Sequence, residues 1–257
     1  MITMGVDVGS TSSKAIILQD GSEILAKTVV NMGTGTQGPG QATEQALAQA
    51  GLCRENIGCM VATGYGRLTF PGADHQVSEV TCHGRGIGFL LPEVRTVIDI
   101  GGQDAKALQI NSRGKLMNFV MNDKCAAGTG RFLDVMAKVL GVPVEGLGQL
   151  SAQSEHPVSI SNVCTVFAES EVISHLAAGA KLSDIAAGIH ISVARRVAAL
   201  AMRVGIEGQV AMSGGVALNQ GVVRAMEMEL KRPVLVHPDA QLAGALGAAL
   251  LAAERMQ

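Results

Sequence analysis

The sequence predicts an α/β fold built from two related halves, each a β-sheet backed by helices, that share a cleft. Three observations predict it. A glycine-containing turn between short apolar strands occurs twice, apolar residues recur at helical spacing over most of the remaining chain, and no long Pro/Ser-rich linker separates the halves. A chain of 257 residues is long enough for one large domain or two small ones.

The repeat lies in the segments 7–15 and 99–107, which match at a constant offset of 92 residues. In both copies the turn joins two strand candidates, and a polar turn then leads to a third. These candidates span residues 3–6, 15–18 and 24–30 in the first copy and residues 96–98, 107–110 and 116–121 in the second. The shared order of strands and turns indicates an internal duplication of a β-meander.

Helical patterns account for most of the remaining sequence. In the clearest one, apolar residues recur every three or four positions from Ile185 to Val204, with Ser183 as the predicted N-cap and Gly205 as the predicted end. Weaker helical patterns span residues 42–50, 77–91, 129–140, 167–178, 218–230 and 242–254. Residues 209–212 and 233–236 are predicted to be buried strands.

Composition excludes several classes of protein. The 20 Lys+Arg and 22 Asp+Glu residues are spread without blocks of one sign, and the aromatic residues are five Phe and one Tyr, so a nucleic-acid partner is not expected. The N-terminus lacks the basic region of a signal peptide. The longest uncharged apolar run, residues 242–253, has 12 residues against the ~20 needed to span a bilayer. We therefore expect a cytoplasmic protein without a membrane span.

The two repeated turns are suited to binding phosphate. The first offers Gly9 and the hydroxyl residues Ser10, Thr11, Ser12 and Ser13, with Asp7 before them and Lys14 after them. Backbone N–H groups of such a turn form a concave set of donors for anionic oxygens, and Asp7 can hold a metal ion through water. The second turn offers Gly101, Gly102, Gln103 and Asp104. One such turn alone is equally well a plain hairpin, but two copies in a duplicated fold favour phosphate binding.

A third glycine pair, Gly214-Gly215, follows a strand candidate and precedes Asn219, where a backbone without Cβ atoms can approach a flat ring closely. The common nucleotide motifs are disfavoured. The chain has no Gly-x4-Gly-Lys-Ser/Thr sequence, so a P-loop is excluded. Residues 33–38 match Gly-x-Gly-x-x-Gly, but Pro39 follows and no acidic residue is placed to hold a ribose, which argues against a Rossmann site.

Two of the five cysteines stand out by their neighbours. Cys125 and Cys164 each come upstream of a helical pattern, where a helix N-terminus would stabilise a thiolate. Their spacing of 39 residues fits no zinc or ferredoxin motif and by itself favours core residues, but Gly128 and Gly130 indicate a bulky group beside the backbone. Cys53, Cys59 and Cys82 are predicted to be small buried residues. The six histidines show no paired spacing typical of metal ligands.

The order of the motifs DVGSTSSK, IDIGGQDAK and MSGGVALN resembles the phosphate-1, phosphate-2 and adenosine motifs of the actin, sugar-kinase and heat-shock ATPase superfamily. Longer motifs resemble, more narrowly, the ATP-dependent activator component of 2-hydroxyacyl-CoA dehydratases, over essentially the whole chain. These motifs are VATGYGR (61–67), IDIGGQDAK (98–106), MNDKCAAGTGRFLDVMA (121–137), CTVFAESEVISHL (164–176) and GALGAAL (244–250).

The resemblance implies a duplicated actin-like ATPase fold, with two ribonuclease H-like domains around a nucleotide cleft. Residues 1–92 and 238–257 would form one subdomain, and residues 93–237 would form a second that carries the cluster cysteines. It also implies ATP and Mg²⁺ as cofactors and one [4Fe-4S] cluster per homodimer, with Cys125 and Cys164 of each copy as ligands. The implied activity is one-electron transfer from reduced ferredoxin or flavodoxin to a 2-hydroxyacyl-CoA dehydratase.

Particular residues carry these expectations. Asp7 and Asp104 are expected near Mg²⁺, and Gln103 is the candidate to orient the attacking water. The residues expected at the phosphates are Ser10, Thr11, Ser12, Ser13, Lys14, Gly101 and Gly102. Those expected at adenosine are Gly214, Gly215, Asn219 and Gln241.

Three other functions compete with this interpretation. The chain could be the ATPase subunit of an aromatic acyl-CoA reductase. It could be a small-molecule kinase of the same superfamily with Asp99 or Asp104 as base, which leaves the two cysteines unexplained. A third alternative is an ATP-switched assembly or chaperone-like protein, which the lack of a separate peptide-binding module disfavours.

Overall fold

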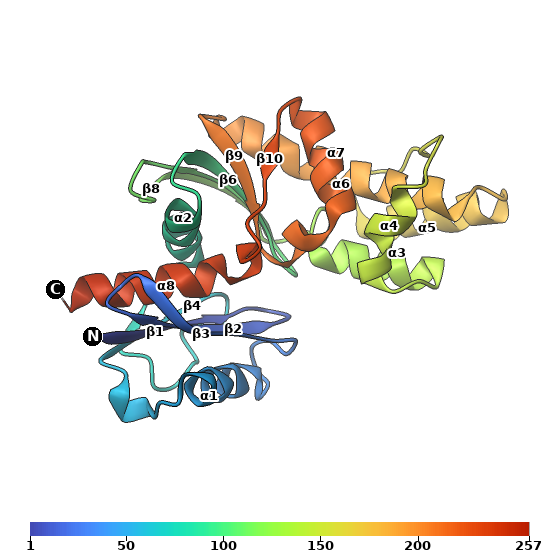
Figure 1. Ribbon diagram of the computed structural model, residues 1–257. Helices are drawn as coiled ribbons and strands as arrows, with labels where there is room; N and C mark the ends of the chain where they lie inside the picture. Colours follow the sequence, from blue (N-terminus) through green and yellow to red (C-terminus); the bar gives the residue numbers. More distant parts are fainter. Residues whose placement is uncertain (257) are drawn as a thin grey trace.

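Each half of the chain forms one five-stranded mixed sheet (Figure 1). The computed structural model describes residues 1–256. The first sheet has the order β3-β2-β1-β4-β5 and the second the order β10-β9-β6-β7-β8. The strands of the first sheet are β1 (Ile2–Val8), β2 (Ser13–Gln19), β3 (Glu23–Val30), β4 (Cys59–Thr63) and β5 (His75–Gln76). Those of the second are β6 (Val94–Ile100), β7 (Ala105–Ile110), β8 (Leu116–Asn122), β9 (Gln209–Ser213) and β10 (Val234–Leu235).

The two sheets repeat each other in register as well as in order. Asp7 pairs with Lys14 across β1 and β2, and Asp99 pairs with Lys106 across β6 and β7. The ladder between the second and third strand shifts after Ile17 in the first sheet and after Gln109 in the second, again 92 residues apart. In both sheets the fourth strand runs parallel to the first. The predicted duplication is confirmed.

All eight predicted strands are present, and two further strands, β4 and β5, were not predicted. Every residue of β4 is buried because this parallel strand lies inside the sheet, so its sequence CMVAT lacks the polar–apolar alternation that marks a half-exposed strand. β5 has only two residues, too few for a pattern.

The predicted helices are also present, with shifted ends. They are α1 (Gly38–Ala50), α2 (Glu79–Leu90), α3 (Gly130–Leu140), α5 (Thr165–Ala177), α6 (Leu182–Val204), α7 (Gln220–Leu230) and α8 (Ala243–Arg255). A short helix α4 (Leu147–Ser151) was not predicted. Single 3₁₀ turns occur at Arg54–Asn56, Val144–Gly146, Gly215–Leu218 and Ala240–Leu242.

The predicted cap of α6 is wrong. The helix ends at Gly205 as expected, but it begins at Leu182, and Ser183 is a buried residue of its first turn. The backbone carbonyl of Lys181 instead accepts the amides of Asp184 and Ile185 at 3.0 and 3.1 Å. Lys181 has the extended backbone angles of an N-cap residue, so the helix begins two residues earlier than it would with Ser183 as the cap.

Helices α2 and α8 lie between the two sheets (Figure 1). α8 packs on β1 and β4 of the first sheet, and α2 packs on α8 and on the second sheet. The two helices meet backbone to backbone, since a Cβ atom on Gly86 would collide with the Ala243 carbonyl and one on Gly247 with the Cys82 carbonyl. This close crossing joins the halves at one end and leaves a cleft between them at the other.

Helix α6 is long and apolar enough, by length and composition, to cross a membrane. Most of that length is buried, and residues such as Ile189, Val193 and Val197 belong to the main apolar core of the second half. It is the core helix of this half.

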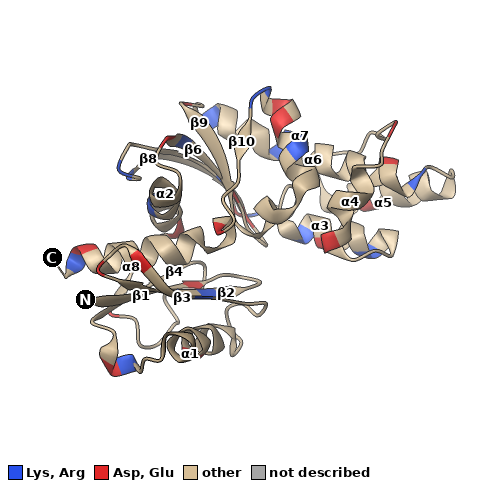
Figure 2. Cartoon of the chain, in the orientation of Figure 1, with Lys and Arg blue, Asp and Glu red and all other residues tan. Residues whose placement is uncertain are grey.

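Charged residues of both signs are interspersed along the chain in both halves (Figure 2). The pattern agrees with the small formal net charge of −2.

Candidate functional site

The first glycine loop, residues 9–12, joins β1 to β2 at the mouth of the cleft. Beneath it, Lys14 Nζ lies 3.1 Å from Asp7 Oδ2 and 3.5 Å from the Ser12 carbonyl oxygen. Ser13 departs from the prediction. It is fully buried at the start of β2, and its hydroxyl donates to the Met32 carbonyl at 2.8 Å, so this hydroxyl is not available to a phosphate.

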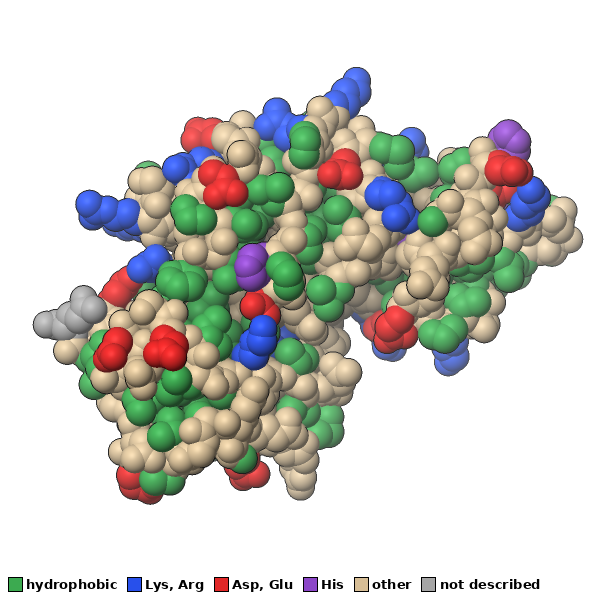
Figure 3. Space-filling model, viewed as in Figure 1, with side chains coloured by type: hydrophobic (Ala, Val, Ile, Leu, Met, Phe, Trp, Pro, Cys, Tyr) green, Lys and Arg blue, Asp and Glu red, His purple; other side chains and the backbone are tan. Residues whose placement is uncertain are grey.

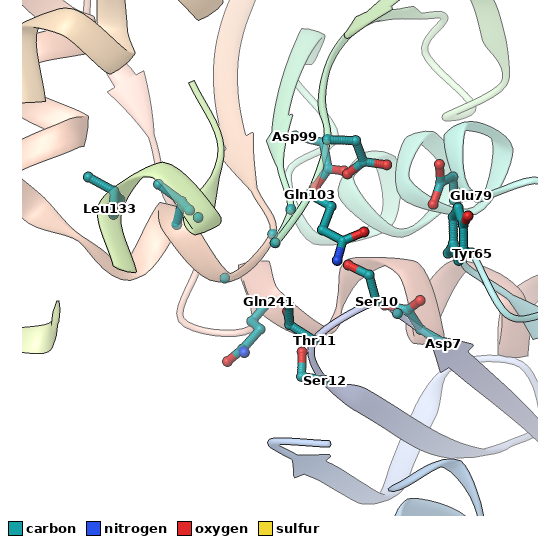
Figure 4. A pocket seen from close by; sticks show the side chains of 18 of the residues that line it. Asp7, Ser10, Thr11, Ser12, Tyr65, Glu79, Asp99, Gln103, Leu133 and Gln241 are labelled. Carbon is teal, nitrogen blue, oxygen red and sulfur yellow. The ribbon is translucent and has the colours of Figure 1, made fainter. Parts of the chain in front are cut away.

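The second glycine loop, residues 101–104, faces the first across the cleft. A side chain on Gly102 would collide with Thr11, so the two loops touch directly. Figure 4 shows the exposed Gln103 side chain extending into the cavity toward Ser10. Two adjacent glycine loops, with polar side chains on both, are suited to enclose a phosphate chain.

Beside the second loop, Lys106 is buried among three carboxylates. Its Nζ lies 2.8 Å from Asp104 Oδ2, 3.2 Å from Asp99 Oδ2 and 3.3 Å from Glu79 Oε1. Burial alone would lower the pKa of Lys106, but the three carboxylates raise it above its usual range. The lysine therefore stays charged, and the excess of negative charge makes this wall attractive to a cation.

Asp99 lies in a hydrogen-bonded group drawn from three elements. Ser213 Oγ donates to Asp99 Oδ1 at 2.9 Å, and His83 Nδ1 lies 3.1 Å from both atoms. Burial by itself would raise the pKa of the Asp99 carboxyl, but His83, Lys106 and Ser213 together hold it at about 2. Glu79 differs, because its burial outweighs the attraction of Lys106 and raises the pKa of its carboxyl.

A third group of residues lines the far wall of the cleft. Gly214 has φ +83°, which favours glycine, and its amide donates to the Ala240 carbonyl at 3.2 Å. Gln241 is the residue after Ala240, and its side chain lies beside Gly215. Asn219 caps α7, since its Oδ1 accepts the amides of Gly221 and Val222 at 2.9 and 3.3 Å.

A hydrogen bond with His190 fixes the orientation of the Asn219 side chain. With Oδ1 occupied, Nδ2 points to His190 Nε2 at 3.2 Å, so the histidine accepts this hydrogen bond. Burial, with a smaller effect of Arg224, lowers the pKa of His190 to about 4. His190 is therefore neutral at pH 7 and can serve as the acceptor.

These three groups line one cavity of about 760 Å³, within the range of roughly 300–1,000 Å³ typical of small-molecule sites. The surface is hollowed between the first half and the arm formed by α3, α4 and α5 (Figure 3). The predicted residues that line the cavity are Asp7, Ser10, Thr11, Ser12, Lys14, Gly101, Gly102, Gln103, Asp104, Gly214, Gly215, Asn219 and Gln241. Of the predicted phosphate and adenosine residues, only Ser13 is not among them.

Glu79, His83 and Lys106 also line the cavity and were not predicted from the sequence. Lys106 had a signal, because it is the duplicated counterpart of Lys14. Glu79 and His83 had none, since they reach the cleft from α2, which has no counterpart among the repeated motifs.

Away from the cleft, the structure brings the two predicted cysteines onto neighbouring loops. Cys125 Sγ lies 3.9 Å from the carbonyl oxygen of Val163, the residue before Cys164, and both thiols are partly exposed. Large apolar side chains beside them face solvent, with Val163, Val166 and Phe167 each more than 60% exposed. An exposed apolar stripe of this kind is typical of an interface.

Both cysteines were predicted to lie at the start of a helix, and this prediction is right for Cys164 and wrong for Cys125. Cys164 is the N-cap residue of α5, but Cys125 lies in a loop before the Thr129 cap of α3. The first amides of α3 do not face Cys125. Those of Gly130 and Arg131 donate to the carbonyls of Gly101 and Gly102 at 2.9 and 2.8 Å.

The remaining cysteines are not all buried. Cys59 and Cys82 are buried as predicted, and burial raises the pKa of the Cys82 thiol to about 12. Cys53 is exposed, and its thiol donates to Asn56 at 3.0 Å, so the prediction of burial is wrong there.

The donor sets fit the two implied groups differently. Mg²⁺ commonly takes one or two carboxylates together with substrate phosphates, which Asp7 and Asp104 in the cleft can provide. Iron–sulfur clusters take four thiolates. Among residues 1–256, no group of three or more His, Cys, Asp or Glu side chains could hold a metal ion. The paired thiols therefore fit half of such a site, and a second chain would have to supply the other half.

Comparison with known proteins identifies the family. The BadF/BadG/BcrA/BcrD ATPase family matches residues 4–252. The chain belongs to this family. It is 56% identical to the 2-hydroxyisocaproyl-CoA dehydratase activator of Clostridioides difficile over 98% of this chain and 95% of that one. It is 54% identical to the activator of lactoyl-CoA dehydratase of Anaerotignum propionicum over 100% and 99% of the two chains.

A solved activator structure from Clostridium difficile, with bound ADPNP, superposes with a TM-score of 0.96 at 56% identity, covering 99% of this chain and 95% of that one. A ROK family glucokinase from Streptomyces griseus shares the fold alone, with a TM-score of 0.60 at 18% identity, covering 99% of this chain and 100% of that one. The predicted duplicated actin-like ATPase fold is confirmed. One of the subunits of benzoyl-CoA reductase from Thauera aromatica is a more distant relative, 36% identical over 99% of this chain and 94% of that one.

Proposed function

We propose that this protein is the ATP-hydrolysing activator of a 2-hydroxyacyl-CoA dehydratase, to which it passes single electrons from reduced ferredoxin or flavodoxin. The observation that carries the proposal is the combination of a cleft lined by two glycine loops with two partly exposed cysteines on adjoining loops. The higher identity to dehydratase activators, 54–56% against 36% for the reductase chain, favours a dehydratase as partner. A small-molecule kinase would not need the cysteine pair.

In the cleft, the triphosphate would lie between the two glycine loops. Lys14 has one carboxylate partner and can turn toward phosphate, whereas Lys106 is held by three carboxylates. Asp7 and Asp104 would hold Mg²⁺ against the phosphates. Gln103, whose amide carries both a donor and an acceptor, would orient the attacking water. Gly214, Gly215, Asn219 and Gln241 would surround the adenosine.

At the cysteines, Cys125 and Cys164 of two identical chains would hold one [4Fe-4S] cluster, which when bound supplies one-electron redox chemistry. The exposed stripe of Val163, Val166 and Phe167 would be covered by the second chain. An isologous dimer brings the same patch of both copies together, so two thiols per chain become four.

The two subdomains would be residues 1–92 with 238–257, and residues 93–237.

ATP is required because the electron must reach an acceptor of very low potential. Each additional ~100 mV costs about 2.3 kcal/mol per electron. Hydrolysis in a cleft between two halves could supply this free energy through a change in their relative position.

The test is an anaerobic purification followed by two measurements. Iron and sulfide analysis should give about four irons per dimer. With reduced ferredoxin or flavodoxin, the protein should activate an iron–sulfur 2-hydroxyacyl-CoA dehydratase only when ATP is present. A colourless preparation that hydrolyses ATP at full rate would overturn the redox part of the proposal, and phosphorylation of a small molecule would favour the kinase.

A further inference from the structure

The loop that carries Cys125 begins and ends at the second glycine loop. This Cys125 loop, residues 123–129, follows Asn122, the last residue of β8, which pairs with Ala105 directly after the glycine loop. It leads into Gly130, the first residue of α3, whose amide donates to the Gly101 carbonyl. Both ends of the Cys125 loop are thus attached to the wall of the nucleotide cleft.

The attachment through α3 is close. A helix leaves its first amides without partners inside the helix, and here the amides of Gly130 and Arg131 are used by carbonyls of the glycine loop at 2.9 and 2.8 Å. A Cβ atom on Gly130 would lie 3.2 Å from the Gly101 carbonyl oxygen. A displacement of the glycine loop must therefore either move the first turn of α3 with it or break both of these hydrogen bonds.

The attachment through Asn122 reaches the cysteine itself. Its side-chain Nδ2 donates to the Cys125 carbonyl at 3.0 Å and to the Ala127 carbonyl at 3.3 Å, so both amide hydrogens hold the backbone of the Cys125 loop. Asn122 does not line the nucleotide cavity. Its side chain binds the cysteine loop and nothing else that is described.

The duplication shows that Asn122 is special to the second half. In the first sheet the residue at the same register is Val30, which pairs with Ser13 as Asn122 pairs with Ala105, 92 residues on. The side chain of valine has no hydrogen-bond donor, and the segment between Val30 and α1 carries no cysteine. The asparagine thus occurs in the copy of the repeat whose next loop holds Cys125.

The loop that carries Cys164 contacts helix α6, as the Cys125 loop does. Gly128 of the Cys125 loop packs on Arg196 and Val197 of α6, and Arg196 Nη1 donates to the Asn162 carbonyl at 3.4 Å, two residues before Cys164. Together with the contact between Cys125 Sγ and Val163, this makes the two cysteine loops neighbours on α6.

We propose that Asn122 is a positioning residue that makes the position of Cys125 follow the nucleotide state of the second glycine loop. The proposal rests on the proposed function, since it concerns how the nucleotide acts on the cysteines. A nucleotide shifts the loop only through different affinity for its two positions, and Asn122 transmits that shift to the backbone of Cys125.

The test compares Asn122→Ala with Asn122→Asp and with the control Asn118→Ala. Asn118 lies on the same strand and is exposed, and its side chain accepts the Phe119 amide, a hydrogen bond within the strand. Alanine removes both hydrogen bonds, whereas aspartate keeps the size of the side chain but cannot donate. The full-length protein is prepared anaerobically, and iron release to a chelator is timed without nucleotide, with ADP, and with ADP plus aluminium fluoride.

In the wild type and Asn118→Ala, we expect these nucleotides to change the rate of iron release by at least about threefold, the scale of one or two net hydrogen bonds. In Asn122→Ala and Asn122→Asp, which should still hold iron and hydrolyse ATP, the change should fall below about 1.5-fold. A wild-type ratio in both Asn122 variants would overturn the inference, as would a wild type that holds iron without any response to nucleotide.

A second measurement covers variants that lose iron. In iron-free protein, alkylation of Cys125 is followed by peptide-resolved mass spectrometry, with alkylation of the exposed Cys53 as the internal reference. Nucleotide should change the Cys125 rate in the wild type and not in Asn122→Ala; an equal response in both would overturn the inference. A wild type without iron but with a nucleotide-dependent Cys125 rate would overturn the proposed cluster and leave the role of Asn122 standing.

Discussion

Lys106 Nζ lies 3.2 Å from Asp99 Oδ2, and the same pair occurs 92 residues earlier as Lys14 and Asp7 at 3.1 Å. The duplicated pairs have different surroundings. Lys106 also contacts Asp104 and Glu79 and is 2% exposed, whereas Lys14 contacts no second carboxylate among residues 1–256 and is 11% exposed. One lysine is thus available to a ligand, and the other holds the cleft wall together.

This difference predicts unequal effects on stability. Lys106→Met leaves three carboxylates without their shared cation, and breaking such a buried group costs about 3–5 kcal/mol of unfolding free energy. Lys14→Met leaves only Asp7 unpaired and should cost about 1–3 kcal/mol. Urea unfolding at pH 7 under anaerobic conditions measures both. Equal midpoints for the two variants would mean that the three-carboxylate arrangement stabilises the fold no more than the single Asp7–Lys14 pair does.

Asp7 is predicted to matter for hydrolysis and not for the cysteine site. Asp7→Asn keeps the size of the side chain but weakens Mg²⁺ binding, so the rate of ATP hydrolysis should fall by roughly 10²–10³-fold. Iron content should be unchanged, since Asp7 lies on β1 and the cysteine loops on the other half.

The matched control is Asp20→Asn, which removes an exposed carboxylate that pairs with the N-terminus. Phosphate release and iron content are measured on the same preparations. Full hydrolysis by Asp7→Asn would mean that the first glycine loop is wrongly assigned.

How much of the site could be predicted from the sequence depended on repetition. The two glycine loops, and the opposition of Asp7 to Lys14 and of Asp99 to Lys106, follow from one motif found twice, since a strand pair fixes which residues face each other. Cys125 and Cys164 were singled out because each precedes a helical pattern, with Gly128 and Gly130 close to Cys125, and the family resemblance implied their role as ligands. These are local signals that a single segment carries.

What could not be predicted is assembled from distant segments. Glu79 and His83 meet Lys106 and Asp99 because α2 packs on the second sheet, and Ser213 meets Asp99 because β9 pairs with β6. Ser13 was predicted to bind phosphate because it adjoins three other hydroxyl residues, but as the first residue of β2 it points into the protein. Cys125 was predicted at a helix start, yet the first turn of α3 is drawn to the second glycine loop instead.

The cysteines give a prediction about stoichiometry. Cys125→Ser and Cys164→Ser should each lose the iron of a preparation that otherwise holds about four irons per dimer, because two of four thiolate ligands disappear from the dimer. Binding of ATP in the separate cleft should persist. Cys53→Ser is the control, since that thiol is exposed and contacts Asn56. Four irons per monomer, or full iron in Cys164→Ser, would exclude a shared cluster.

His190 gives a prediction about pH. Its pKa falls on folding from 6.5 to about 4, so its contribution to stability is complete above pH 6.5 and is lost as the pH falls toward 4. By proton linkage, this one group should reduce the free energy of unfolding by about 2 kcal/mol between pH 7 and pH 5. His190→Gln keeps an acceptor for Asn219 Nδ2 but does not titrate in this range, so the variant should lose that part of the pH dependence.

Urea unfolding of the wild type and of His190→Gln at pH 7 and pH 5 measures the difference. The control is His237→Gln, because His237 is partly exposed and its Nδ1 accepts the Asp239 amide. If His190→Gln loses as much stability as the wild type between the two pH values, His190 is not the neutral acceptor that holds Asn219 against the cleft.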